Sequence, residues 1–94
     1  MKPRKSRDID NQLKRKGFKK EERDHAFYFL YYKNKKTSVY TKISHGISEY
    51  GNHLLNQMAQ QLSLTATELN RFLDCPLTYE NLINILIEKK RIDI

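Results

Sequence analysis

The fold is decided by residues 23–46, RDHAFYFLYYKNKKTSVYTKISHG. Two runs rich in aromatic and β-branched residues flank the polar segment 33–36, which predicts a β-hairpin with a loop of three to five residues. Asn34 suits this loop because asparagine tolerates a positive φ. His25 opens the first predicted strand and His45 closes the second. Antiparallel pairing therefore predicts that both imidazoles lie at the same end of the sheet.

The register of this hairpin depends on the length of its loop. With a four-residue loop at 33–36, His25 lies opposite Ser44, whereas a loop one residue shorter sets His25 directly opposite His45. Only the second register places both imidazoles on one face, where one would act as base and the other as acid. The sequence leaves both registers open.

Alternation along the first strand places aromatic side chains on both faces of the sheet. One face holds His25, Phe27, Phe29 and Tyr31, and the other holds Ala26, Tyr28, Leu30 and Tyr32. Helices cover only one face of such a sheet. We therefore expect an exposed aromatic surface that stacks bases, docks a protein, or joins two copies of the chain as a homo-oligomer.

The charge of the chain is uneven. The formal net charge is +7, and residues 1–46 hold 14 basic and 5 acidic residues, whereas residues 47–94 hold 4 basic and 6 acidic ones. A one-sided positive field favours a polyanionic partner such as nucleic acid. The alternative is a lysine-rich surface that only keeps the protein soluble, but such a surface does not require the charges to segregate.

Several function classes are disfavoured. The 94 residues suffice for one domain, 1–94, but not for a cofactor-binding fold of Rossmann type. No apolar stretch follows the basic start, so we expect a cytoplasmic protein without a signal peptide or membrane span. The three histidines lack metal-ligand spacing, so no metal or cofactor is expected. Cys75 is expected to be a buried or half-buried structural thiol.

The flanking segments predict an α+β fold: one helix, a three-stranded antiparallel sheet, then helices packed on one face. The first helix is expected to be capped by Ser6 or Asp8 and to end at Gly17. A short edge strand at 18–23 completes the sheet. Three helices follow. The first covers about 49–62, the second opens with a capping box at Thr65–Glu68, and the third begins near Thr78.

Four short motifs follow one another in the chain: Lys16-Gly17-Phe18, Asp24-His25-Ala26-Phe27-Tyr28, His45-Gly46 and Leu62-Ser63-Leu64-Thr65-Ala66-Thr67-Glu68-Leu69. Their order resembles that of the HicA toxins. The resemblance spans roughly residues 7–75, and residues 76–94 form a C-terminal helical extension. The resemblance implies a fold like that of double-stranded-RNA-binding domains, endoribonuclease activity on messenger RNA, a catalytic histidine at His25, and a HicB-type antitoxin partner. The Gly-Ser that usually precedes this histidine is Arg23-Asp24 here, and the second histidine of the usual pair is Ala26.

The chemistry of the residues is compatible with RNA cleavage that needs no metal. The substrate's own 2′-hydroxyl serves as nucleophile, so the protein supplies a proton-transferring group, which histidine provides near neutral pH, and cations around the phosphate. His25 is the first catalytic candidate and His45 the second. The expected RNA contacts are Lys14, Lys19, Lys20, Arg23, Tyr28 and Lys42. The alternative function is a basic RNA- or DNA-binding module without catalysis.

Overall fold

The protein folds as a small α+β structure with a three-stranded antiparallel sheet and four helices, as predicted. The computed structural model describes residues 2–74 and 76–92, so the expectation for Cys75 lies outside the described residues. The elements are β1 (Arg4–Lys5), α1 (Ser6–Arg15), β2 (Phe18–Glu22), β3 (Ala26–Tyr32), β4 (Lys35–Ile43), β5 (Glu49–Tyr50), α2 (Asn52–Gln61), α3 (Ala66–Leu73) and α4 (Tyr79–Glu88).

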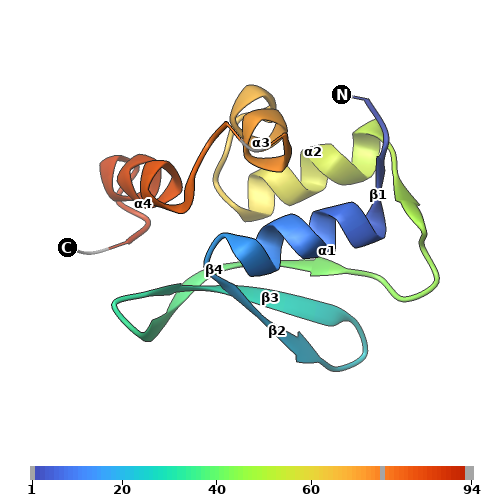
Figure 1. Ribbon diagram of the computed structural model, residues 1–94, viewed down its shortest axis with the longest axis horizontal. Coiled ribbons are helices and arrows are strands. Elements are labelled where there is room, and N and C mark those ends of the chain that lie inside the picture. The colour runs from blue at the N-terminus through green and yellow to red at the C-terminus, as the bar shows by residue number, and fades with distance from the viewer. Residues whose placement is uncertain (1, 75, 93–94) are drawn as a thin grey trace.

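All of the helices lie on the same side of the main sheet, whose strand order is β2-β3-β4 (Figure 1). Apolar side chains from the two layers meet between them, and the larger fully buried ones are Ile9, Leu13, Tyr28, Leu30, Val39, Leu55, Met58, Leu62, Leu69, Phe72, Leu82 and Leu86. The apolar side chains of the helices and the inward-facing residues of β3 and β4 therefore form one core. Within the part of the chain that the structure describes, no helix covers the opposite face of the sheet (Figure 1).

The hairpin loop is shorter than predicted. Tyr32 pairs with Lys35, so only Lys33 and Asn34 form the turn, and both have a positive φ, of 52° and 63°. Two positive φ values identify a turn whose twist matches that of the flanking strands, which explains why this compact connection wins over a loop of three to five residues. The prediction of a longer loop was wrong.

A bulge in β4 restores the register that a four-residue loop would have set. Phe29 pairs with Tyr40 and Tyr31 with Lys36, so three residues of β4, residues 37–39, lie opposite the single residue Leu30. Within the bulge the Thr37 hydroxyl donates a hydrogen bond to the Leu30 carbonyl at 2.7 Å. Beyond the bulge Ala26 pairs with Ile43, and the same register sets His25 opposite Ser44.

Two local predictions about the helices were wrong. The first helix begins at Ser6 after Lys5, and among the described side chains none caps it; Ser6 instead donates to the carbonyl of Ile47 at 2.6 Å. The helix expected from about residue 49 begins only at Asn52, because Glu49–Tyr50 pairs with Arg4–Lys5 in a separate two-stranded sheet. The edge strand at 18–23 is confirmed as Phe18–Glu22.

The capping box predicted at the start of α3 is confirmed, and the structure shows a second one at the start of α4. Thr65 and Glu68 exchange hydrogen bonds at the start of α3, and Thr78 and Asn81 do so at the start of α4.

Lys16 is buried and donates hydrogen bonds from Nζ to the carbonyls of Phe72 and Leu77, at 2.6 and 2.8 Å. These bonds join the end of α1 to the last turn of α3 and to the segment between α3 and α4.

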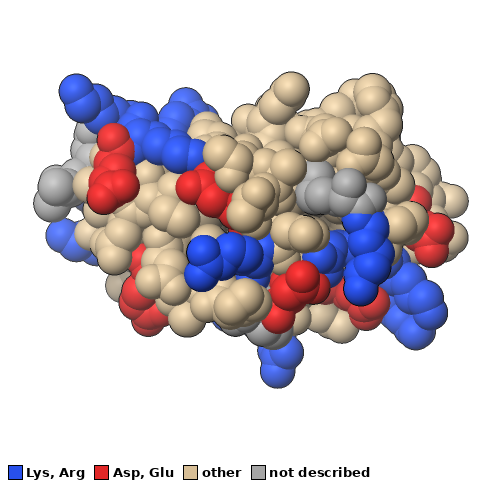
Figure 2. Space-filling view, turned by 90° about the horizontal axis from the view of Figure 1, so that it is seen from above, with Lys and Arg blue, Asp and Glu red and all other residues tan. Residues whose placement is uncertain are grey.

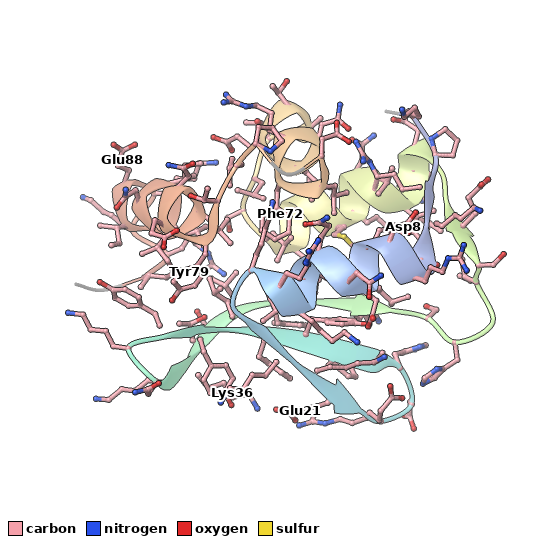
Figure 3. The ribbon with its side chains drawn as sticks, in the orientation of Figure 1. Asp8, Glu21, Lys36, Phe72, Tyr79 and Glu88 are labelled. Carbon is pink, nitrogen blue, oxygen red and sulfur yellow. The ribbon has the colours of Figure 1, made fainter. Side chains whose placement is uncertain are left out.

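Gly17 ends α1 and packs against Tyr79, the first residue of α4. Its φ is +91°, and a Cβ placed there would overlap the ring of Tyr79. The Tyr79 hydroxyl donates a hydrogen bond to the carbonyl of Tyr31 at 2.8 Å, so this ring also links α4 to β3 (Figure 3). Only glycine meets both the conformational and the packing requirement here.

We expect Gly17→Ala to lower the free energy of unfolding by about 2–4 kcal/mol, the sum of left-handed backbone strain and overpacking against Tyr79. Gly46→Ala is the matched control, because Gly46 has a φ of +85° but no described atom lies within 4 Å of the place that a Cβ would take. The control should lose only the strain component, about 1–2 kcal/mol. Urea unfolding followed by circular dichroism measures both. Equal losses of unfolding free energy in the two variants would show that the Tyr79 ring moves aside without an energetic penalty.

Candidate nucleic-acid interface

The face of the sheet that no helix covers carries a continuous group of aromatic and charged side chains, which we call the open face. Pairing across the strands defines it in rows. One row is Lys19, Phe29 and Tyr40; the next is Glu21, Phe27 and Lys42; and Tyr31 pairs with Lys36 beside them. Directly paired residues project on the same side of a sheet, so these side chains share one surface.

Three rings form the centre of the open face. The ring centroids of Phe27 and Phe29 are 6.2 Å apart with nearly parallel planes, and Tyr40 lies 6.2 Å from Phe27 and 5.6 Å from Phe29. Tyr40 is 43% exposed, more than any other large apolar side chain among the described residues. Flat, partly exposed rings on a rigid sheet form the kind of surface on which unpaired bases stack.

Cations flank these rings. Lys36 Nζ lies 3.9 Å from the ring centroid of Phe29, and Lys19 Nζ lies 4.3 Å from that of Tyr31. The Arg23 guanidinium lies 5.5 Å from the Phe27 centroid and 5.8 Å from that of Phe29. These are cation–π distances. The open face therefore combines stacking surface with positive charge.

One carboxylate joins two of these cations. Glu21 accepts a hydrogen bond from Lys36 Nζ at 2.7 Å and another from Arg23 Nη2 at 2.6 Å. Lys36 and then Arg23 hold the pKa of the Glu21 carboxyl below its ordinary value. Figure 3 shows Lys36 and Glu21 projecting from the sheet on the side away from the helices.

His25 lies at one end of the open face. It belongs to the turn between β2 and β3, and its ring centroid is 6.4 Å from that of Phe27. Its Nδ1 atom is buried with no hydrogen-bond partner among the described residues. The imidazole thus stands next to the aromatic rings, with Arg23 in the same turn and Lys42 paired with the neighbouring Phe27.

His45 lies on the other side of the sheet. Its Nε2 is 3.6 Å from Glu22 Oε2, and it lines a pocket of about 310 Å³ together with Ala26, Tyr28 and Ile43, which point toward the helices. His45 lies in the turn after β4, two residues beyond Ile43, on the same side of the sheet as that inward-facing side chain. The two imidazoles therefore do not share a face as an acid–base pair requires.

Three of the predicted RNA contacts also lie on the helical side. Tyr28 is 1% exposed and donates a hydrogen bond to Asp10 at 2.5 Å, so its ring is buried and not on the surface of the protein. Lys14 and Lys20 both form ion pairs with the same Asp10, at 2.9 and 3.1 Å. Lys19, Arg23 and Lys42, in contrast, lie on the open face.

The group around Asp10 holds α1 against the sheet. Burial and then the hydrogen bond to Asp10 raise the pKa of the Tyr28 hydroxyl far above its ordinary value. Burial raises the pKa of Asp10, but hydrogen bonds from Tyr28, Lys14 and Lys20 outweigh it, and the pKa lies below its ordinary value. These residues are explained by structure rather than by a ligand.

The positive charge of the first half of the chain does not form a continuous patch on the helical side. Seen from above, Lys and Arg alternate with Asp and Glu and are separated by uncharged surface (Figure 2). Arg4, for example, lies 2.7 Å from the carboxylate of Asp74 in the second half of the chain. The segregation along the sequence is therefore only partly kept in space.

The alternation along β3 had already placed Phe27 and Phe29 on one face of the sheet, whereas sequence reasoning did not place Tyr40 and Lys36 on the open face. The face on which Tyr40 and Lys36 lie depends on the register of β4, which changes at the bulge between them. The sequence contains no signal for that bulge.

Comparison with known proteins finds no relative for this chain: no family model, curated protein or solved structure matches it. Within residues 2–74 and 76–92, no group of three or more His, Cys, Asp or Glu side chains is placed to hold a metal ion. Over the same residues, no helix has both the length and the apolar character to cross a membrane.

Proposed function

We propose that this protein binds single-stranded RNA on the open face of its sheet. The observation that carries the proposal is the cluster of Phe27, Phe29 and Tyr40 on a face without helices, bordered by cations. Aromatic rings on a sheet stack unpaired bases, and neighbouring Lys and Arg side chains hold the phosphates. A double helix offers no free base surfaces to such rings, so the substrate class is unpaired RNA.

We further propose that the bound RNA is cleaved next to His25. In this mechanism His25 takes the proton of a 2′-hydroxyl, whose oxygen attacks the adjacent phosphorus. The bond to the 5′-oxygen breaks, and that oxygen takes a proton from water, leaving a 2′,3′-cyclic phosphate and a 5′-hydroxyl. Arg23 and Lys42 stabilise the negative charge that develops on the phosphate.

The proposed biological role is that of a cytoplasmic toxin whose activity a HicB-type antitoxin blocks. The support is the resemblance of residues 7–75 to HicA toxins, and with it goes a fold like that of double-stranded-RNA-binding domains. The test is expression of the chain without a partner. We expect growth arrest with loss of messenger RNA, and we expect purified protein to cleave an unpaired RNA oligonucleotide.

A second candidate is an RNA- or DNA-binding module without catalysis. It is favoured by the position of His45 on the helical side, which leaves His25 without a second histidine on the open face. The two candidates differ in one measurement, the appearance of cyclic-phosphate ends on RNA incubated with the protein. Binding without such ends selects the second candidate.

The two adjacent lysines of β2 test which face binds RNA. Lys19 lies on the open face, whereas Lys20 pairs with Asp10 and Glu22 on the helical side. Lys19→Gln should lower the slope of log affinity against log salt by about 0.7, the value for one phosphate contact on a single strand. Lys20→Gln removes the same charge and should leave the slope nearly unchanged. Fluorescence anisotropy at several salt concentrations measures both slopes, and equal changes would contradict binding on the open face.

A further inference from the structure

Two cations from separate segments converge on one anionic group of the open face, the carboxylate of Glu21 in the edge strand β2. Arg23 belongs to the turn after β2, and Lys36 lies near the start of β4, yet both donate hydrogen bonds to the carboxylate of Glu21. The two bonds go to different oxygens of that carboxylate. We call this arrangement the Glu21 bridge.

The Glu21 bridge lies across the rings proposed to bind RNA. The Lys36 ammonium is centred 3.9 Å from the Phe29 ring centroid, and the Arg23 guanidinium is within 6 Å of both Phe27 and Phe29. Both cations therefore occupy space in which a stacked base would sit. Tyr40 lies beside these two rings and is more exposed than either Phe27 or Phe29.

We propose that Arg23 and Lys36 form a binding site for one phosphodiester of the RNA, and that Glu21 occupies this site in the free protein. The inference rests on the proposed function and deepens it. A carboxylate presents two anionic oxygens, as does a phosphodiester, and arginine binds both through the same fork of donors. When the RNA phosphate takes the place of Glu21, the two cations turn from the rings to the strand, and a base stacks on Phe29.

The Glu21 bridge therefore sets a threshold for binding. An anion that only replaces Glu21 gains little binding free energy, because Arg23 and Lys36 are already paired in the free protein. A ligand that also stacks a base on the uncovered rings gains the stacking free energy as well. The site thus favours nucleotides over simple anions.

The substitution Glu21→Gln tests this inference, and Glu22→Gln is its matched control. Both change the net charge by one and lie next to each other in β2, but Glu22 faces the helical side, where it contacts Lys20 and His45. The probe is a fluorescein-labelled oligouridylate of about 12 nucleotides, titrated at low salt. We expect Glu21→Gln to bind about five- to tenfold more tightly than Glu22→Gln, since each exposed ion pair broken on binding is worth up to about a fivefold change. The difference should shrink as salt rises, because exposed pairs are screened.

A double-mutant cycle separates occupation of the site from simple repulsion of the RNA. If Glu21 acts by holding Lys36, then Glu21→Gln in a Lys36→Gln background should gain distinctly less affinity than in the wild type. If the gain is the same in both backgrounds, Glu21 acts only as a distant negative charge and the inference is overturned. Circular dichroism of each variant verifies that the fold is retained.

The outcomes also distinguish this inference from the proposed function. Wild-type protein that binds RNA through Phe27 and Phe29, with equal affinities for Glu21→Gln and Glu22→Gln, would overturn the phosphate site and leave RNA binding intact. If neither the wild type nor Glu21→Gln binds the oligonucleotide, RNA binding on this face is itself overturned.

Discussion

Replacing His25 with alanine is expected to lower the rate of RNA cleavage by about 10²- to 10⁴-fold, the contribution usual for an acid–base group. The reason is that His25 is the only imidazole at the open face among the described residues, since His45 lies on the helical side and His53 in α2. Initial rates on an unpaired RNA with a fluorophore and a quencher measure the effect. In cells, growth arrest and loss of messenger RNA should both disappear.

Binding and the second histidine serve as controls for this prediction. His25→Ala should bind uncleaved RNA with nearly wild-type affinity, because the rings and cations of the open face are retained. His45→Ala should keep most of the cleavage activity, because its imidazole contacts Glu22 and faces a pocket on the helical side. Wild-type and His25→Ala proteins of equal activity and toxicity would refute the assignment of His25.

Replacing both Phe27 and Phe29 with leucine is expected to weaken RNA binding by about 10²-fold. Stacking of a base on an aromatic side chain is worth about 1–3 kcal/mol, so the loss of two stacking rings near the lower end of that range corresponds to about a hundredfold change. Leucine keeps an apolar side chain at both positions but has no flat ring. Anisotropy titration with oligouridylate measures the change.

The salt dependence of binding shows whether this loss comes from stacking. The double leucine variant retains Lys19 and Lys42 on the open face. Its slope of log affinity against log salt concentration should therefore equal that of the wild type, although its affinity for RNA is lower. Its midpoint of urea unfolding reports any loss of stability. Unchanged affinity in a folded variant would show that the rings of Phe27 and Phe29 do not stack bases.

Local chemistry was sufficient to predict much of this fold from the sequence. Thr65 and Glu68 exchange hydrogen bonds within four residues, so the start of α3 depends on nothing distant. The alternation along β3 likewise determined that Phe27 and Phe29 share a face, because strand geometry places every second side chain on the same side. Gly17 as the end of α1 followed from the same kind of local rule.

The sequence could not predict the features that depend on pairing between distant segments. Ser6 has the side chain of a helix cap, but its hydroxyl bonds to Ile47, which becomes its neighbour only in the folded chain. Two-residue strands such as Glu49–Tyr50 carry no periodic signal, so β1 and β5 escaped prediction. Tyr28 was predicted to contact RNA because nothing near it in the sequence indicated its partner Asp10, which lies 18 residues earlier in the chain.

The candidate site divides in the same way. The sequence determined which residues have the necessary chemistry: a histidine at one end of the hairpin, aromatic residues along β3 and cations around them. Only the tertiary structure decided which of them share a surface. The bulge opposite Leu30 set the register of β4, brought Tyr40 beside Phe29, and left His45 facing away from His25. Neither chain segment encodes that result alone, because register is a property of two strands packed against one core.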